Sequence, residues 1–130
     1  MSRVKLAAVM VVCGAIAVAA YSQAASGGGV RTRFAAYTTT ISPIRGGVSV
    51  KLFGRVGARP HKCRAHRKAV LYFNRIDRRH RGDSDWSSRH GAVALIGEWH
   101  AAPRRIFVIV HQKRIGPHSK CLRFRYPRSY

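Results

Sequence analysis

Acidic residues are the scarcest charged groups in this sequence. Its 130 residues include 4 Asp or Glu against 25 Lys or Arg, so the formal net charge is +21. So few carboxylates make an enzyme mechanism based on paired Asp or Glu side chains improbable. Cysteine is scarce as well, with 3 in the whole chain, which excludes a small scaffold held together by many disulfides. The length allows one ordinary domain and excludes a large multidomain enzyme.

Long apolar runs are absent beyond the N-terminal segment. The longest later runs have five residues, as in residues 106–110, which is too short to span a bilayer. Hydrophobic residues still make up 46% of the chain. This share is too high for a disordered basic tail and is enough for a modest hydrophobic core.

The N-terminal segment has the pattern of a secretory signal. Arg3 and Lys5 precede residues 6–20, which carry no charge and end in small residues. A helix of that length reaches ~22 Å, short of the ~30 Å hydrocarbon core of a membrane. We therefore predict a signal peptide over residues 1–24, an exported chain and no stable membrane span after cleavage. An uncleaved membrane anchor is the alternative.

The mature chain would keep two cysteines. Cleavage removes Cys13, Arg3 and Lys5, lowers the net charge to +19 and leaves Cys63 and Cys121. In an exported chain, two cysteines favour one disulfide. The open alternatives are two free thiols and a zinc site that adds His61, His66 or His118 as ligands. An oxidising compartment opposes the thiolates, and neighbouring cations oppose a divalent ion: Lys62, Arg64, Arg67, Lys68 and Lys120. We predict no metal and no cofactor.

Short strands separated by turn signals fill the rest of the chain. Apolar residues alternate over 48–56 and 122–126, and they form continuous runs over 69–73, 92–96 and 106–110. Residues 64–77 are the best helical candidate, but their β-branched and aromatic residues favour a strand. Turn signals occur at Ser42-Pro43, Gly46-Gly47, Arg81-Gly82-Asp83 and Arg89-His90-Gly91, among others. We predict an all-β chain with a flexible linker over 25–36 and a single antiparallel β-sandwich of six to seven strands over 37–130. An immunoglobulin-like or prealbumin-like arrangement is expected.

Several motifs follow one another in a fixed order along these strands. They are Phe53-Gly54-Arg55-Val56, Cys63, residues 67–72, an Asp- and Ser-containing strand before the Gly91 turn, residues 107–110 and Cys121. This order resembles a family of secreted bacterial β-sandwich domains related to the carboxypeptidase regulatory-like and transthyretin-like modules, over roughly residues 37–127. The resemblance implies a Cys63–Cys121 pair and a non-catalytic extracellular module. Val93 stands where that family has an aromatic residue, so Trp86 or Trp99 would supply the missing bulk.

Groups that could support catalysis have simpler interpretations. Asp85, Ser88 and His90 are close in sequence, but no nucleophile-elbow motif accompanies them. Asp83 and Asp85 would face the same side of a strand, where flanking arginines would compensate their charge. The Arg81-Gly82-Asp83 tripeptide is interpreted as a turn. We predict that the protein is not an enzyme.

The positive charge is the feature with the clearest functional meaning. Arginine binds phosphates and carboxylates through two parallel hydrogen bonds and stays charged at every relevant pH. Seven residues around the last strands are predicted to form an anion-binding stripe: Arg104, Arg105, Lys113, Arg114, Arg123, Arg125 and Arg128. The expected partners are anionic polymers of the cell envelope or extracellular space, bound in a salt-dependent way, with no sequence-specific recognition of nucleic acid. The alternatives are a secreted cationic effector, membrane-active or polymer-degrading, and a structural module with no ligand.

Overall fold

The computed structural model describes residues 29–127, and these residues form an all-β fold. The predicted signal peptide over 1–24 and Arg128 lie outside this range. The elements are β2 (Gly29–Val30), β3 (Arg33–Ile44), β4 (Gly47–Gly57), the 3-10 turn η1 (His61–Cys63), β5 (Lys68–Phe73), the 3-10 turn η2 (Arg78–His80), β6 (Arg81–Trp86), β7 (Ala92–Trp99), β8 (Ile106–Val110), β9 (Lys113–Arg114), β10 (Lys120–Cys121) and β11 (Phe124–Tyr126). Over the described part of the chain, no helix has the length and apolar content needed to cross a membrane.

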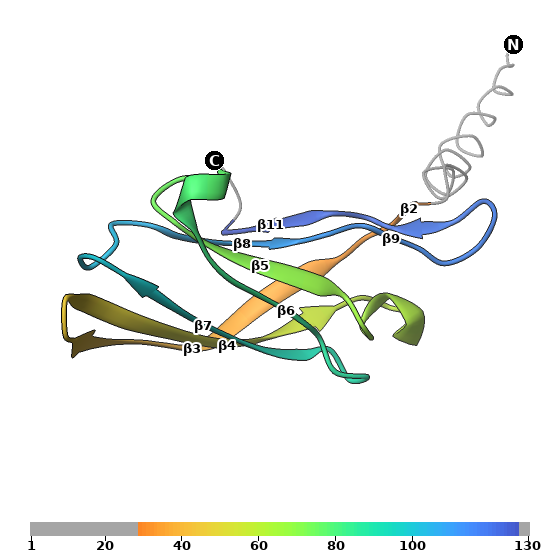
Figure 1. Ribbon diagram of the computed structural model, residues 1–130. Coiled ribbons are helices and arrows are strands. Elements are labelled where there is room, and N and C mark those ends of the chain that lie inside the picture. The colour runs from red at the N-terminus through yellow and green to blue at the C-terminus, as the bar shows by residue number, and fades with distance from the viewer. Residues whose placement is uncertain (1–28, 128–130) are drawn as a thin grey trace, which may run out of the picture.

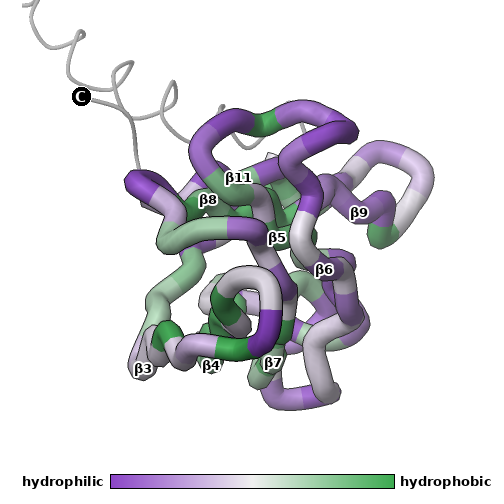
Figure 2. The backbone as a smooth tube through the Cα atoms, turned by 60° about the vertical axis from the view of Figure 1, so that its left-hand side comes forward, coloured by the Kyte–Doolittle hydropathy of each residue, from purple (hydrophilic) through white to green (hydrophobic). Residues whose placement is uncertain are grey.

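Two main sheets are stacked as layers. One sheet has the strand order β3-β4-β7 and the other β11-β8-β5-β6, and a smaller sheet joins β2, β10 and β9. In Figures 1 and 2, β3, β4 and β7 form the lower layer, and β5, β8 and β11 lie above it. All pairs within the two main sheets are antiparallel. The predicted antiparallel sandwich is therefore confirmed, and the helical alternative over 64–77 is wrong because the middle of this segment, Lys68–Phe73, pairs as β5.

The core forms where the inward faces of both sheets meet. Its buried side chains come from the alternating strands and from the apolar runs: Phe34, Val50, Leu52, Val56, Ala69, Leu71, Phe73, Val93, Leu95, Val108 and Val110. Trp99 packs against this cluster, with its ring centroid 5.3 Å from that of Phe73. Trp86 is 59% exposed. Of the two tryptophans considered from the sequence, Trp99 thus contributes bulk to the core.

The linker predicted over 25–36 is wrong from residue 29 onward. Gly29 and Val30 pair with β10, and β3 begins at Arg33. Phe34 is 5% exposed and belongs to the core. The ordered sandwich therefore begins before residue 37, because an apolar side chain and the pairing with Cys121 hold this segment in place.

Two predicted turns are strands. Residues 42 and 43 lie inside β3, the outermost strand of its sheet, where a proline is tolerated because one side of the strand needs no hydrogen-bonding partner. Residues 81–83 open β6, and a register shift of the β5–β6 pair falls at this point. The predicted turns at Gly46 and Gly91 are confirmed, and both glycines have positive φ angles of 84° and 92°.

The disulfide and a buried arginine hold the end of the sandwich at η1. Cys63 and Cys121 are bonded to each other, as predicted, and both are fully buried. Beside them Arg67 is 0% exposed. Its Nε and Nη2 donate to the carbonyl of His111 at 3.2 and 2.8 Å, and Nη2 also donates to the carbonyl of Leu122 at 3.0 Å. Its Nη1 donates to Thr32 Oγ1 at 2.9 Å and to the carbonyl of Cys63 at 2.7 Å. All five guanidinium N–H groups are thus satisfied without a carboxylate.

Candidate functional site

Two adjoining hollows lie on either side of the segment that connects β2 to β3. The first, of about 400 Å³, is lined by Val30, Arg31, Arg33, Gly57, Ala58 and Arg59. The second, of about 350 Å³, is lined by Arg31, Thr32, Arg33, Phe34, Leu122, Arg123 and Phe124. We call the pair the arginine groove, because Arg31, Arg33, Arg59 and Arg123 are its only ionisable lining residues.

Alternation along the chain directs two of these arginines outward. Thr32 is 6% exposed and accepts the hydrogen bond from Arg67, while Phe34 is held in the core. Because side chains of extended residues alternate between two faces, Arg31 and Arg33 must point to the opposite side, and both are exposed. The buried junction at Arg67 therefore fixes the direction of two groove arginines.

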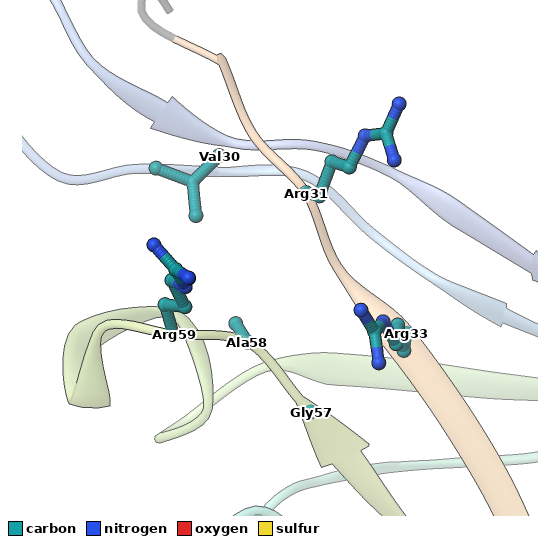
Figure 3. Close-up of a pocket in the computed structure, with 6 residues that line it drawn as sticks. All are labelled: Val30, Arg31, Arg33, Gly57, Ala58 and Arg59. Atoms are coloured by element: carbon teal, nitrogen blue, oxygen red, sulfur yellow. The ribbon is translucent and has the colours of Figure 1, made fainter.

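Arg59 comes from the opposite wall of the first hollow. Gly57, the last residue of β4, pairs with Arg33, so the loop that follows β4 starts directly beside β3. Nη1 of Arg64 fastens this loop by donating to the carbonyls of Ala58 at 3.0 Å and Arg59 at 3.2 Å. Figure 3 shows the Arg59 side chain extending from this loop toward Val30, and the Arg33 side chain lying beside the facing strand, β3.

Arg123 forms the far wall of the second hollow. The residue before it, Leu122, donates its backbone N–H to the carbonyl of Val30 at 2.8 Å. The residue after it, Phe124, packs against the core. Arg123 is held between these two anchors and is exposed beside Arg31, whose side chain leads away from the first hollow in Figure 3.

The positive charge of the groove has no carboxylate partner among residues 29–127. Between residues 29 and 127, the one contact within 4.0 Å between a basic and an acidic side chain joins His80 Nδ1 and Asp77 Oδ1 at 2.6 Å. Within the same residues, none of the four groove arginines donates a side-chain hydrogen bond to another protein group. As far as the described part of the chain is concerned, these guanidinium groups can all donate hydrogen bonds to an external anion.

The few carboxylates are occupied by backbone N–H groups. Asp77 Oδ1 accepts from the N–H of His80 at 3.0 Å, Asp83 Oδ2 from Ile96 at 2.7 Å and Asp85 Oδ1 from Trp86 at 2.8 Å. The hydrogen bond from the His80 side chain also holds the pKa of Asp77 below its ordinary value. Three of the 4 acidic residues thus stabilise the backbone rather than neutralise arginine.

His111 reports the positive potential next to the groove. Its pKa lies below the ordinary value, first because burial disfavours the charged imidazolium and then because Lys68, Arg123 and Arg81 repel a proton. Three cations from β5, β6 and the β10–β11 segment therefore act on one imidazole. A bound anion near Arg123 would partly cancel this repulsion.

The predicted anion-binding stripe is distributed over several places. Arg104 and Arg105 are exposed before β8, where the backbone N–H of each donates to Asn74 Oδ1. Lys113 and Arg114 follow β8 at its other end. Arg125 pairs with Ile109, and its guanidinium carbon lies 5.1 Å from the centre of the Phe107 ring. Of the described residues in the predicted stripe, only Arg123 lines the arginine groove.

The Lys113 side chain stabilises the fold by hydrogen bonding. Its Nζ donates to the carbonyl of Ala65 at 2.8 Å and to that of Lys62 at 3.1 Å, which ties β9 to the η1 region. Burial, followed by repulsion from Arg67, lowers its pKa. A side chain already bonded to two backbone carbonyls has little capacity left for a ligand. Arg114 likewise donates to the carbonyl of Pro117 at 3.3 Å.

The residues considered for metal binding and hydrolysis have other roles. Both cysteines are in the disulfide, so neither can act as a thiolate ligand, and no set of three metal-ligating side chains gathers within residues 29–127. Ser88 Oγ accepts the backbone N–H groups of His90 and Ala92 at 3.2 and 3.1 Å, which supports the turn before β7. Asp83 and Asp85 do share one side of β6, since they pair with the core residues Leu71 and Ala69.

No protein-family model, curated protein or solved structure matches this chain. The resemblance to carboxypeptidase regulatory-like domains therefore stays a prediction. The sequence pattern did not indicate the groove arginines Arg31, Arg33 and Arg59, the first two of which lie in the predicted linker. The alternation of Arg31, Thr32, Arg33 and Phe34 was the signal that could have revealed two of them.

Proposed function

We propose that this protein is an exported, non-enzymatic β-sandwich module that associates with anionic polymers outside the cell or in its envelope. The arginine groove is the proposed contact surface. One observation carries the proposal. The lysines and arginines of residues 29–127 form no ion pair with a carboxylate, so their charges are available to an external anion.

Several exposed arginines on one surface suit a polymer with repeated phosphate or carboxylate groups. Arg31 and Arg33 belong to both hollows, so one strand of polymer could contact Arg59, the shared pair and Arg123 in succession. Each contact releases condensed counterions, so the affinity should fall steeply as salt increases. The buried disulfide supports export, because disulfides persist in oxidising compartments.

The test is isothermal titration of the full-length mature chain with two probes, polyphosphate and polygalacturonate, at several sodium chloride concentrations. The groove variant carries Arg31→Gln, Arg33→Gln, Arg59→Gln and Arg123→Gln. A control variant removes the same charge elsewhere through Arg78→Gln, Arg79→Gln, Arg104→Gln and Arg105→Gln, all of which are exposed. We expect the groove variant to bind at least about tenfold more weakly than the control and to show a salt slope lower by about 3 to 4.

The outcomes separate the proposal from its rivals. Equal losses in both variants would show that net charge alone attracts the polymer and would reject the groove as the contact surface. Binding no stronger than that of an unrelated protein of equal charge would indicate a structural module. Shortening of either polymer during the titration, measured by gel electrophoresis, would instead indicate a polymer-degrading effector.

A further inference from the structure

The outward face of the β3-β4-β7 sheet carries large apolar side chains that are exposed to solvent. Tyr37 is 65% exposed, Phe53 43% and Ile96 49%. Phe53 pairs with Ala94, and Lys51 pairs with Ile96, which places these four side chains on the same side of the sheet. We call the surface formed by Tyr37, Lys51, Phe53, Arg55, Ala94 and Ile96 the aromatic face.

A β-bulge brings Tyr37 onto this face. Ala36 pairs with Gly54 and Thr38 with Phe53, so Tyr37 is an extra residue without a partner in β4. Bulges of this kind redirect a side chain, and here Tyr37 and Phe53 line the same shallow hollow. The hollow has a volume of about 400 Å³, and its floor includes Gly54 and Ala94. Two aromatic rings therefore frame an open apolar depression.

Two cations lie on either side of Phe53 in β4. Lys51 and Arg55 lie two residues before and after Phe53 in β4, and all three are exposed. Neither cation forms an ion pair with any residue that the structure describes. Glu98, opposite Ser49, is the acidic residue on this side of β7. The aromatic face thus combines exposed rings, an exposed aliphatic side chain and unpaired cations.

This combination matches the interface of an anionic lipid bilayer. Tyrosine and phenylalanine insert among lipid headgroups, and the long stems of lysine and arginine lie along apolar surface while their charges reach the phosphates. A second copy of the chain fits less well, because it offers one carboxylate on this face, Glu98, against the two cations Lys51 and Arg55. An anionic bilayer supplies many negative charges to both cations at once.

We propose that the aromatic face docks the protein on anionic lipid bilayers. The inference is independent of the arginine groove, which involves other residues and a different ligand. It predicts two separable contributions to membrane binding: attraction of the cations to lipid phosphate, and insertion of Tyr37 and Phe53, which persists when salt screens the first.

The test is co-sedimentation of the full-length mature chain with vesicles of phosphatidylcholine mixed with phosphatidylglycerol, and with vesicles of phosphatidylcholine alone. The face variant is Tyr37→Thr with Phe53→Thr. The matched control, Ile41→Thr with Trp86→Thr, removes two exposed apolar side chains that lie away from this face. Circular dichroism verifies that each variant is folded, and titration with polyphosphate verifies that the groove is intact.

We expect the wild-type protein and the control to bind the mixed vesicles, and the face variant to bind them about tenfold more weakly at high salt. Lys51→Gln with Arg55→Gln should reduce the preference for phosphatidylglycerol. Equal binding by the face variant and the control would overturn the proposal, because charge alone would then explain the attachment. So would wild-type protein that ignores vesicles and forms a dimer that the face variant cannot form.

Discussion

The buried guanidinium of Arg67 offers the sharpest test of how this fold is held together. Replacing it by methionine keeps much of its volume and removes every hydrogen bond that it donates. The carbonyls of Cys63, His111 and Leu122 and the hydroxyl of Thr32 would each lose a donor. A buried acceptor left without a partner, as at Cys63 and Thr32, costs about 1 kcal/mol or more, and the part-buried carbonyls of His111 and Leu122 cost less because water can reach them. We therefore expect Arg67→Met to lower the free energy of unfolding by about 2 to 4 kcal/mol.

Urea unfolding measures this loss. The fluorescence of Trp99 provides the signal, since its ring packs against Phe73 in the core. A small domain has about 5–15 kcal/mol of stability, so Arg67→Met could leave the chain unfolded. Arg67→Lys keeps the charge and three donors, and we expect it to cost about half as much.

The result that would refute this reasoning is a loss below about 1 kcal/mol for Arg67→Met. It would mean that the cost of burying the guanidinium away from water cancels its hydrogen bonds, as occurs for some buried charges. Arg64→Met is the control, because Arg64 is only half-buried and bonds to two carbonyls of one loop. We expect that variant to lose no more than about 1 kcal/mol.

Three further predictions concern other parts of the sandwich. Cys63→Ala with Cys121→Ala should lower the free energy of unfolding by about 4 kcal/mol in urea titrations, because the bond closes a loop over 58 positions. The pKa of His111 should lie below 6.5 in NMR titrations, and Arg123→Ala should raise it. Since the unfolded chain takes up this proton more readily, the contribution of His111 to stability should decline as the pH falls through about 6.5. Gly97→Ala should destabilise the protein by about 1–3 kcal/mol on urea unfolding, because its Cβ would lie 2.9 Å from the carbonyl oxygen of Gly82.

The sequence predicted those strands whose burial leaves a clear pattern. β4 alternates because one side faces the core and the other faces solvent, and β5 and β8 are continuous apolar runs because both sides are covered. β3 was missed over much of its length. It is an edge strand, and from residue 37 to residue 41 every side chain is exposed, so no alternation is visible.

The candidate site was less predictable for a physical reason. The arginine groove forms where β2, β3, the loop after β4 and the segment before β11 meet, and no local pattern indicates that these segments are neighbours. Arg67 illustrates the same limit. In the sequence it is one of many arginines and was counted among the cations that oppose a metal ion. Only the topology shows that five neutral acceptor contacts surround it.

The way the acidic residues are used has a practical consequence for finding the ligand. Because Asp77, Asp83 and Asp85 accept backbone N–H groups, the lysines and arginines of residues 29–127 lie close together in the folded state without a carboxylate partner. Any anion that binds the folded state better than the unfolded chain raises the melting temperature, by an amount that grows with the logarithm of its concentration divided by its Kd. A thermal-shift screen of anionic glycans, phosphates and lipids would therefore rank ligands without assuming where on the surface they bind.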